Sequence, residues 1–422
     1  PTHERLPAVI CHFVPTSSHD SCLIRFHTSA LYTYMALLQN STLPPAQPAY
    51  VFRGHNAQIH SICFVRHNTR LLTGDAEGWL ILWNLASKRP VAVWRGHAAA
   101  ILAVSTWTDD KLITHGRDSK LRVWQLRESD ESTFSVVLPI EDPVTLRHEP
   151  WLLHTISVNT LNFCSFSFCE ASPSEAAQLS SEAKETTLLV AVPGDREGDI
   201  DIYSLPSKTK LSTVCAPKTV KLGMAMCVKI SIQGPQIILI AGYESGHCCF
   251  WQFDKDRSKW ILLSTSKSHS QPVLSLDIAH SLKRYYTSAA DATIASHSLT
   301  EPTTSQPLKT IETKHSGQQS LRVRSDDKIL ATAGWDGNVR VYSVKTMREL
   351  AVLKWHKQGC YALAFADLLP EQVEDSETNS TGSSEGTEAL QTAVQRRNTK
   401  AQTTHWIAAG SKDGKVSLWD IY

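Results

Sequence analysis

The sequence predicts an all-β protein, a seven-bladed β-propeller whose N-terminal strand completes the last blade. Residues 51–124 contain one pattern twice, running from Arg-Gly-His through alternating apolar residues to a Trp. The two Trp residues, Trp83 and Trp124, are 41 positions apart. The pattern then recurs, with substitutions, to the C-terminus. A period of about 40 residues is typical of propellers, because each repeat forms one four-stranded blade.

The repeats resemble WD40 repeats, in which a His, a hydroxyl, an acid in a tight turn and an aromatic residue form one buried hydrogen-bonded network. Buried polar groups need partners, so a complete set indicates a rigid blade. The hydroxyl lies four positions before the turn acid and the aromatic residue six after it. Blade 2 offers the complete set His97, Thr114, Asp118 and Trp124, and blade 6 offers His315, Thr332, Asp336 and Tyr342.

The remaining five blades carry eroded versions of this set. In chain order they offer His55, Thr73, Glu77 and Trp83 in blade 1, Glu197 and Tyr203 in blade 3, Ser245 and Trp251 in blade 4, His269, Thr287, Asp291 and His297 in blade 5, and His356, Asp413 and Trp419 in blade 7, where Ala409 occupies the hydroxyl position.

Insertions are predicted near residues 127–150, 170–187 and 368–404. The last is rich in Ser, Thr, Gln and Glu and poor in aromatic residues, so it cannot bury enough apolar surface to fold alone. We therefore expect deletion of 371–404 to be tolerated. One strand-like core, Trp151–Phe168, remains between the first two insertions. With the insertions subtracted, each long gap holds one blade, which gives seven.

The two ends of the propeller are predicted to meet. The chain stops at Tyr422, directly after the third strand of blade 7, and Pro48–Arg53 is strand-like. Pairing of this segment with blade 7 would remove an open sheet edge. We expect residues 46–422 to form the propeller and 1–45 a disordered extension. Met35 leads directly into the first repeat, so one hypothesis is that translation begins there; the alternative is that 1–34 is a genuine tail.

Composition narrows the functional classes. The net charge of +1 gives no general attraction to nucleic acid, and no apolar run of about 18 residues exists that could cross a membrane. Ten cysteines without paired spacing favour reduced thiols. His247, Cys248 and Cys249 are adjacent, but neighbouring strand residues point to opposite faces. No P-loop, GxSxG or HExxH motif is present, so we expect no catalytic residue, metal, cofactor or small-molecule substrate.

A binding platform is the remaining prediction. The residue before each turn acid is expected to project onto one rim of the disc, and Tyr361 is expected on the same face. The candidate rim residues are Arg117, Arg196, Glu244, Trp335, Lys412 and Tyr361, with Ala76 and Ala290 in the other blades. Trp and Arg are common in interface hot spots. The alternatives are that Trp335 packs flat over a neighbouring blade and that the arginines are simply solvated.

Three segments point to a particular family: YVFRGHNAQIHSICF (Tyr50–Phe64), PWLLHTISVNTLNFC (Pro150–Cys164) and AGYESGHCCFWQ (Ala241–Gln252). Over Met35–Tyr422 the chain resembles the fungal ASTRA-associated protein 1 family, whose animal relative is the G-protein-β-like WD40 protein. The resemblance implies a non-enzymatic scaffold of the nuclear ASTRA assembly, with Tel and Tti proteins, Rvb-type AAA+ ATPases and a transcription-associated PI3K-like kinase as protein partners. It also implies a link to chromatin organisation and kinase maturation, in the nucleus and also the cytoplasm.

Two other classes stay open. Substrate receptors of cullin ubiquitin ligases often carry Trp-Asp-x-Arg at the end of a repeat, and this chain has Trp124-Gln125-Leu126-Arg127. An enzyme with its active site in the propeller channel is the third class, and the sequence offers no convergent acid–base set for it. A histone-tail contact is compatible with the scaffold.

Overall fold

The computed structural model describes residues 46–160, 164–179, 187–301, 305–369 and 393–421. The chain divides into two compact units, Pro1–Ala46 and Gln47–Tyr422. The N-terminal extension and the hypothesis of a start at Met35 lie outside the described residues. All that follows concerns the second unit.

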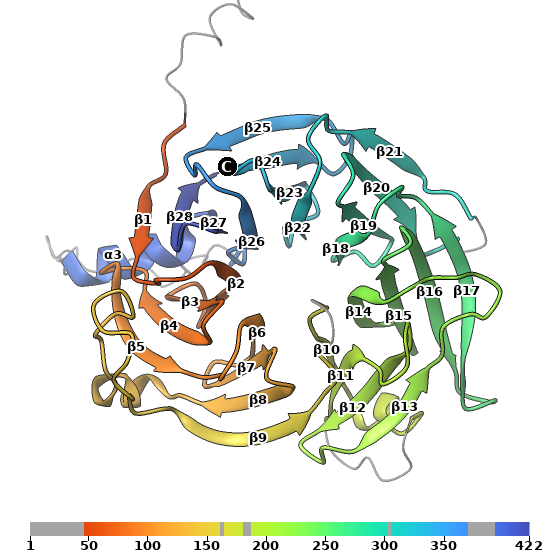
Figure 1. Cartoon of the computed structure of the whole chain (residues 1–422), viewed down its shortest axis with the longest axis horizontal. Coiled ribbons are helices and arrows are strands. Elements are labelled where there is room, and N and C mark those ends of the chain that lie inside the picture. Colours follow the sequence, from red (N-terminus) through yellow and green to blue (C-terminus); the bar gives the residue numbers. More distant parts are fainter. Residues whose placement is uncertain (1–45, 161–163, 180–186, 302–304, 370–392, 422) are drawn as a thin grey trace, which may run out of the picture. The chain divides into compact units, whose positions relative to one another are not determined.

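The second unit is a seven-bladed propeller of four-stranded antiparallel sheets, which confirms the predicted fold class (Figure 1). Blade 1 contains β2 (Ile59–Val65), β3 (Arg70–Asp75), β4 (Trp79–Asn84) and β5 (Arg89–Arg95). Blade 2 contains β6 (Ile101–Thr108), β7 (Lys111–Gly116), β8 (Lys120–Gln125) and β9 (Trp151–Ser157). Blade 3 contains β10 (Ser167–Ala171), β11 (Thr187–Pro193), β12 (Ile200–Leu205) and β13 (Lys210–Val214).

Blade 4 contains β14 (Ala225–Gln233), β15 (Gln236–Tyr243), β16 (His247–Asp254) and β17 (Lys259–Lys267). Blade 5 contains β18 (Val273–Ile278), β19 (Arg284–Ala289), β20 (Thr293–Ser298) and β21 (Lys309–Glu312). Blade 6 contains β22 (Gln318–Val323), β23 (Ile329–Gly334), β24 (Asn338–Ser343) and β25 (Glu349–Lys354). Blade 7 contains β26 (Cys360–Phe365), β27 (Trp406–Ser411), β28 (Lys415–Asp420) and β1 (Tyr50–Arg53).

The first strand of blades 1 to 6, and β26 in blade 7, lies nearest the centre of the ring (Figure 1). The second and third strands are covered on both faces by the adjacent blades, and their sequences are correspondingly apolar, as in the fully buried LLTGD part of β3. A short apolar run bounded by turn residues is the pattern of a strand buried on both faces. The sequence of each blade thus fixes how deep each strand lies.

The core is divided among the junctions between blades. Seven clusters of buried apolar residues occur in the described chain, and each joins two neighbouring blades. Between blades 1 and 2, for example, the rings of Trp94 and Trp124 meet edge to face with their centroids 6.4 Å apart. Such a pair adds about 0.5–1.5 kcal/mol beyond the area that it buries. No blade therefore has a complete core of its own.

The N-terminal strand closes the ring as predicted. β1 pairs antiparallel with β28, with Phe52 opposite Val416. The Phe52 side chain is buried and lies 5.0 Å from the Trp83 ring of blade 1. Closure therefore ties the two ends of the propeller together and covers the edge of β28.

The first insertion is folded onto the propeller. It begins with the 3₁₀ helix η1 (Glu128–Thr133) and then crosses blade 1, where the Val93 amide donates to the carbonyl oxygen of Ser135. Arg147 lies over the Trp79 ring at 4.5 Å. The strand-like core Trp151–Phe168 is shared between two blades, because β9 is the outer strand of blade 2 and β10 opens blade 3. The helical turn α2 (Pro173–Ala176) follows β10.

The third insertion differs from the prediction at its C-terminal part. Residues 393–403 form helix α3 (Ala393–Thr403), and Ala401 within it is 3% exposed. Trp406 donates its indole N–H to the Ala401 carbonyl oxygen at 2.9 Å, and the Asn68 side chain donates to that of Gln402 at 3.1 Å. These contacts hold a polar helix that could not bury enough surface by itself. Residues 370–392 lie outside the described residues.

Candidate functional site

The blade 2 residues lie together in one hydrogen-bonded network. His97 Nδ1 lies 2.8 Å from Asp118 Oδ1, and His97 Nε2 lies 2.8 Å from Thr114 Oγ1. Trp124 donates its indole N–H to the same Thr114 oxygen at 2.8 Å. Burial lowers the pKa of His97 and outweighs the raising effect of Asp118, so the imidazole is neutral. A neutral ring that donates from Nδ1 and accepts at Nε2 satisfies all four side chains.

The blade 6 residues do not form the predicted network. His315 is exposed, with Nδ1 3.6 Å from Asp336 Oδ2, and Thr332 donates instead to Gln318 Oε1 at 2.6 Å. The cause is the spacing, because His315 precedes β22 by three residues, whereas His97 precedes β6 by four. Gln318 fills the space that is left. Tyr342 is buried in the core.

In blade 1 the acid is Asp75, and the prediction of Glu77 is wrong. Asp75 Oδ2 lies 2.8 Å from His55 Nδ1, and Glu77 is exposed. Asp75 is the last residue of β3, the position that Gly116 occupies in β7, so its carboxylate projects from the strand itself. The carboxylate also accepts a hydrogen bond from the Glu77 amide. Thr73 completes the set by contacting His55 Nε2 at 2.7 Å.

Blades 5 and 7 show two further substitutions. In blade 5, Thr287 Oγ1 lies 2.8 Å from His269 Nε2 and 3.2 Å from His297 Nε2, so a second His stands where Trp124 does. In blade 7 the hydroxyl comes from the third strand, because Ser417 Oγ contacts both His356 Nε2 and the indole N–H of Trp419 at 2.9 Å. In these blades the ring nitrogens are engaged in holding strands together.

The structure places the six candidate rim residues in three groups. Trp335 and Tyr361 line one cavity of about 410 Å³, and Arg196 and Glu244 line another of about 330 Å³. Arg117 and Lys412 are exposed in the corresponding turns of blades 2 and 7 and line neither cavity. The first group lies at the centre of the ring, and we call its cavity the mouth.

The mouth is built from the inner strands of six blades. Each contributes its second residue, and each of these lies at a β-bulge where the strand register shifts. These residues are His60, Leu102, Met226, Leu274, Gln319 and Tyr361. A bulge re-aims the side chain of the extra residue, which explains why these six face the opening. The sequence prediction found only Tyr361, because the signal is a position in the strand and not a residue type.

Trp335 is fixed at the edge of the mouth and is still accessible. Its side chain is 47% exposed, and its indole N–H donates to Gln319 Oε1 at 2.8 Å. Gly317 lies under the ring with φ +75°, and a Cβ at that position would come within 2.1 Å of the ring. One face of the ring therefore packs against Gly317 and the other is open to solvent, and a role in partner binding stays a prediction.

Exposed apolar side chains also occur in the first insertion and at the start of β9, which follows it. The side chains of Val144, Leu146 and Trp151 are 83%, 90% and 74% exposed. Exposed apolar side chains of this size are candidates for a protein contact. They stand among polar and charged neighbours, so no apolar run marks them in the sequence.

The described residues contain no group of three or more His, Cys, Asp or Glu side chains that could hold a metal ion. Cys248 and Cys249 are buried, and burial raises the pKa of each thiol, to about 12 for Cys249. His247 contacts Ser245 Oγ at 2.8 Å. Among the described helices, none is long and apolar enough to span a membrane.

Fold and site together define a closed β-propeller with engaged polar networks inside its blades and an apolar mouth on its axis. The family model for ASTRA-associated protein 1 matches residues 48–419. A curated ASTRA-associated protein 1 from Verticillium alfalfae is 43% identical over 429 aligned positions, covering 100% of this chain and 99% of the relative. Those from Aspergillus flavus and Schizosaccharomyces pombe are 42% and 31% identical and cover 90% and 89% of this chain, and 98% and 99% of their own lengths. The chain belongs to the ASTRA-associated protein 1 family.

Proposed function

We propose that this chain is a non-enzymatic scaffold subunit of an ASTRA-type complex, which binds its partners through the mouth. The name of the family supports association with ASTRA. The finer roles, chromatin organisation and maturation of PI3K-like kinases in the nucleus, follow from the family resemblance. Its expected partners are Tel and Tti proteins, Rvb-type ATPases and a transcription-associated PI3K-like kinase.

The observation that carries this proposal is the half-exposed Trp335 beside Tyr361 and Met226 at the mouth. Binding energy at protein interfaces concentrates in a few aromatic anchors in well-packed pockets. The Gln319 hydrogen bond and the contact with Gly317 hold the ring in place before a partner arrives. A side chain that is already ordered loses less conformational entropy on binding.

Affinity purification of the tagged full chain, with mass spectrometry of the retained proteins, tests the proposal. Wild type is compared with Trp335→Ala and with Trp151→Ala, the same substitution on the outer surface of blade 2. We expect Trp335→Ala to lose the ASTRA partners while the chain stays folded. Loss in Trp151→Ala alone would move the interface to the outer strand of blade 2, and retention in both variants would contradict a role for either surface.

Substrate receptor of a cullin ubiquitin ligase is the second candidate. Arg127 is exposed at the start of η1, directly after β8 and the buried Leu126, which is the position of the Arg in the receptor motif. Gln125 stands where that motif has Asp. Recovery of a cullin with its propeller adaptor, and its loss in Arg127→Ala, would favour this function over the scaffold.

A further inference from the structure

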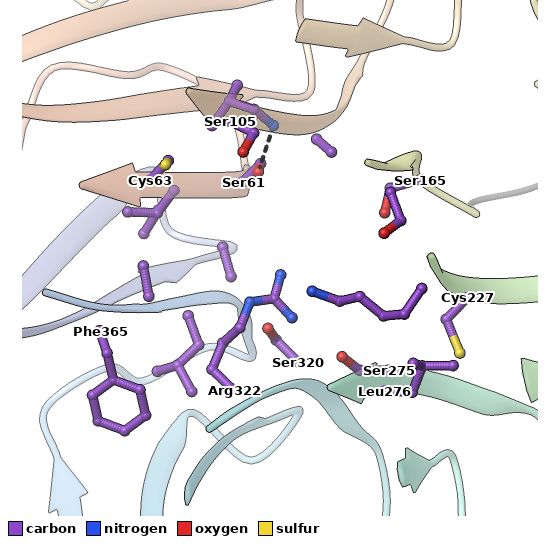
Figure 2. Close-up of a pocket in the computed structure, with 18 of the residues that line it drawn as sticks. Ser61, Cys63, Ser105, Ser165, Cys227, Ser275, Leu276, Ser320, Arg322 and Phe365 are labelled. Atoms are coloured by element: carbon purple, nitrogen blue, oxygen red, sulfur yellow. Dashed lines mark hydrogen bonds between the residues drawn. The ribbon is translucent and has the colours of Figure 1, made fainter. Parts of the chain in front are cut away.

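A second cavity lies on the axis of the propeller, next to the mouth. It encloses about 420 Å³ and shares with the mouth all six bulged residues of the inner strands. Deeper in the ring its lining changes from apolar to polar, and Figure 2 shows Ser61, Ser105, Ser165, Ser275 and Ser320 around the space. The two cavities therefore form one continuous passage from an apolar opening to a polar interior.

Two basic side chains, Lys229 of β14 and Arg322 of β22, line this interior. Lys229 Nζ lies 2.9 Å from Asp277 Oδ1, and the other oxygen of Asp277 accepts the Val323 amide at 2.9 Å. Asp277 is 8% exposed, so the carboxylate and the ammonium cancel each other within the wall. The Lys229 side chain is thereby held in place, and Asp277 balances its charge.

Arg322 is the second basic group, and it lies within electrostatic reach of the same Asp277 without forming an ion pair with it. Its guanidinium extends into the middle of the cavity (Figure 2), where Nη1 donates to the Leu321 carbonyl oxygen at 2.8 Å. No carboxylate within the described residues lies within ion-pair distance of Arg322. A guanidinium presents several donors in a planar fork and binds a carboxylate through two parallel hydrogen bonds. The fork is thus available to an acidic group from outside the chain.

Serine hydroxyls also line this interior. Ser61 Oγ accepts the Val104 amide at 2.9 Å, and Ser275 Oγ accepts the Leu321 amide at 3.1 Å. Each hydroxyl joins two adjacent inner strands through its oxygen. The Ser275 hydroxyl donates to the Leu321 carbonyl oxygen at 3.4 Å, whereas the Ser61 hydroxyl has no acceptor in the wall among the described residues and can donate into the cavity. The interior therefore suits an acceptor-rich group.

We propose that Arg322 binds a carboxylate carried by an extended partner segment that enters through the mouth, an inference that rests on the proposed scaffold function. From Gln319 to Arg322 the inner strand advances three residues, about 10 Å at 3.3 Å per residue. A ligand that spans both regions has an apolar side chain at Trp335 and a carboxylate about three residues further along. One guanidinium without an ion-pair partner matches one carboxylate better than a phosphate dianion, which Asp277 and Asp367 would repel more strongly.

The direction of entry follows from the charges at the two ends. Asp367 lines the cavity beyond the end of β26, on the side away from Tyr361. A carboxylate approaching from that side would meet like charge, whereas the mouth presents apolar side chains. His280 also lines the cavity at the Asp367 end and lies 3.8 Å from Asp327.

The probes are three peptides measured by isothermal titration calorimetry on the full chain. They are acetyl-Phe-Ser-Ser-Asp with a free C-terminus, the same peptide with a C-terminal amide, and acetyl-Phe-Ser-Ser-Asn amide, which has no carboxylate. We expect the first to bind about tenfold more tightly than the last, as is usual for a hydrogen-bonded charge. Equal affinity for the two Asp peptides would identify the Asp side chain as the group that Arg322 binds. A higher affinity for the peptide with a free C-terminus would identify the terminal carboxylate instead.

Arg322→Gln keeps the size of the side chain and removes its charge, and Arg257→Gln is the matched control, because Arg257 is 67% exposed on the outer turn of blade 4. We expect the preference for carboxylate to vanish in Arg322→Gln and to persist in Arg257→Gln. Equal affinity of wild type for all three peptides, or a preference unchanged in Arg322→Gln, overturns the proposal. If Arg322→Gln does not fold, the affinities of wild type are measured at increasing salt concentration. An ionic contact weakens with salt, so the preference for the carboxylate peptides should shrink, and a preference that salt leaves unchanged contradicts the proposal.

The result separates this inference from the scaffold function. Loss of ASTRA partners in Trp335→Ala, together with equal binding of the three peptides by wild type, would leave the scaffold standing and remove the carboxylate site.

Discussion

Asp75 and His55 form a buried pair in blade 1, with Asp75 Oδ2 2.8 Å from His55 Nδ1 and both side chains almost fully excluded from solvent. We therefore expect Asp75→Ala to lower the free energy of unfolding by about 1–3 kcal/mol, because it leaves a buried imidazole donor without its partner. Glu77→Ala, two residues away and exposed, is the matched control and should change stability by less than about 0.5 kcal/mol. Chemical denaturation of both variants measures this, and equal losses would assign the role to the turn rather than to the strand.

Asp118 should make the stability of blade 2 sensitive to acid. Burial alone would raise its pKa, but the hydrogen bond from His97 and the charge of Arg122 prevail and hold it at about 2, below the usual 3.8. The unfolded chain therefore takes up the proton first, so this contribution is complete above pH 3.8 and is lost as the pH falls towards 2. Asp118→Ala should lose about 1–3 kcal/mol at neutral pH and flatten the unfolding profile in that window. An unaltered profile would mean that the carboxylate has the same pKa in both states.

Replacement of His115 by Phe is predicted to stabilise the protein. It is fully buried against Phe166, and neither ring nitrogen has a hydrogen-bond partner among the described residues. Burial lowers its pKa from 6.5 to about 3, so between these values the unfolded state binds the extra proton and stability falls as the pH falls.

We expect His115→Phe to maintain or increase the free energy of unfolding at pH 7. Between pH 3 and 6.5, the dependence of that free energy on pH should become shallower by about 1.4 kcal/mol per pH unit, the value for one proton. Thermal and denaturant unfolding across the window measure the slope. His67→Phe is the control, because His67 is 63% exposed. A slope equal to that of wild type would show that His115 is protonated in the folded state.

Helix α3 changes the expected result of deleting the third insertion. Removal of 371–390 should leave the melting temperature within a few degrees of wild type. Removal of 371–404 should destabilise the protein by about 1–3 kcal/mol, because Trp406 and Asn68 lose the carbonyl acceptors that Ala401 and Gln402 provide. Differential scanning fluorimetry distinguishes the two deletions, and equal melting temperatures would show that the helix adds nothing to stability.

The number of blades and the closing strand could be predicted because they depend on a repeated spacing and on one missing strand. The acid of blade 1 could not, because Asp75 enters the network from a strand position that holds Gly116 in blade 2. His315 was misassigned because one residue fewer separates it from its strand, a difference that is visible only once the strand boundary is known.

The mouth was predicted only at Trp335 and Tyr361, and its remaining residues have no common chemistry. Leu102, Met226 and Gln319 face the opening because the inner strands bulge at their second residue. Bulges are set by the twist and pairing of the finished sheet, so the sequence of one strand does not reveal them. Arg322 was missed for a similar reason, since its role depends on Asp277 being engaged by a lysine from another blade.

Pairing of β1 with β28 has a consequence for how the protein is made. The first strand of the propeller leaves the ribosome about 360 residues before its partner strand is translated. At about 5–20 residues per second, roughly 20–70 s of synthesis separate the two. Throughout that interval the apolar side chain of Phe52 has no sheet to join. Until β28 has been made, the nascent chain therefore exposes apolar surface and an unpaired strand, which are the features that chaperones shield.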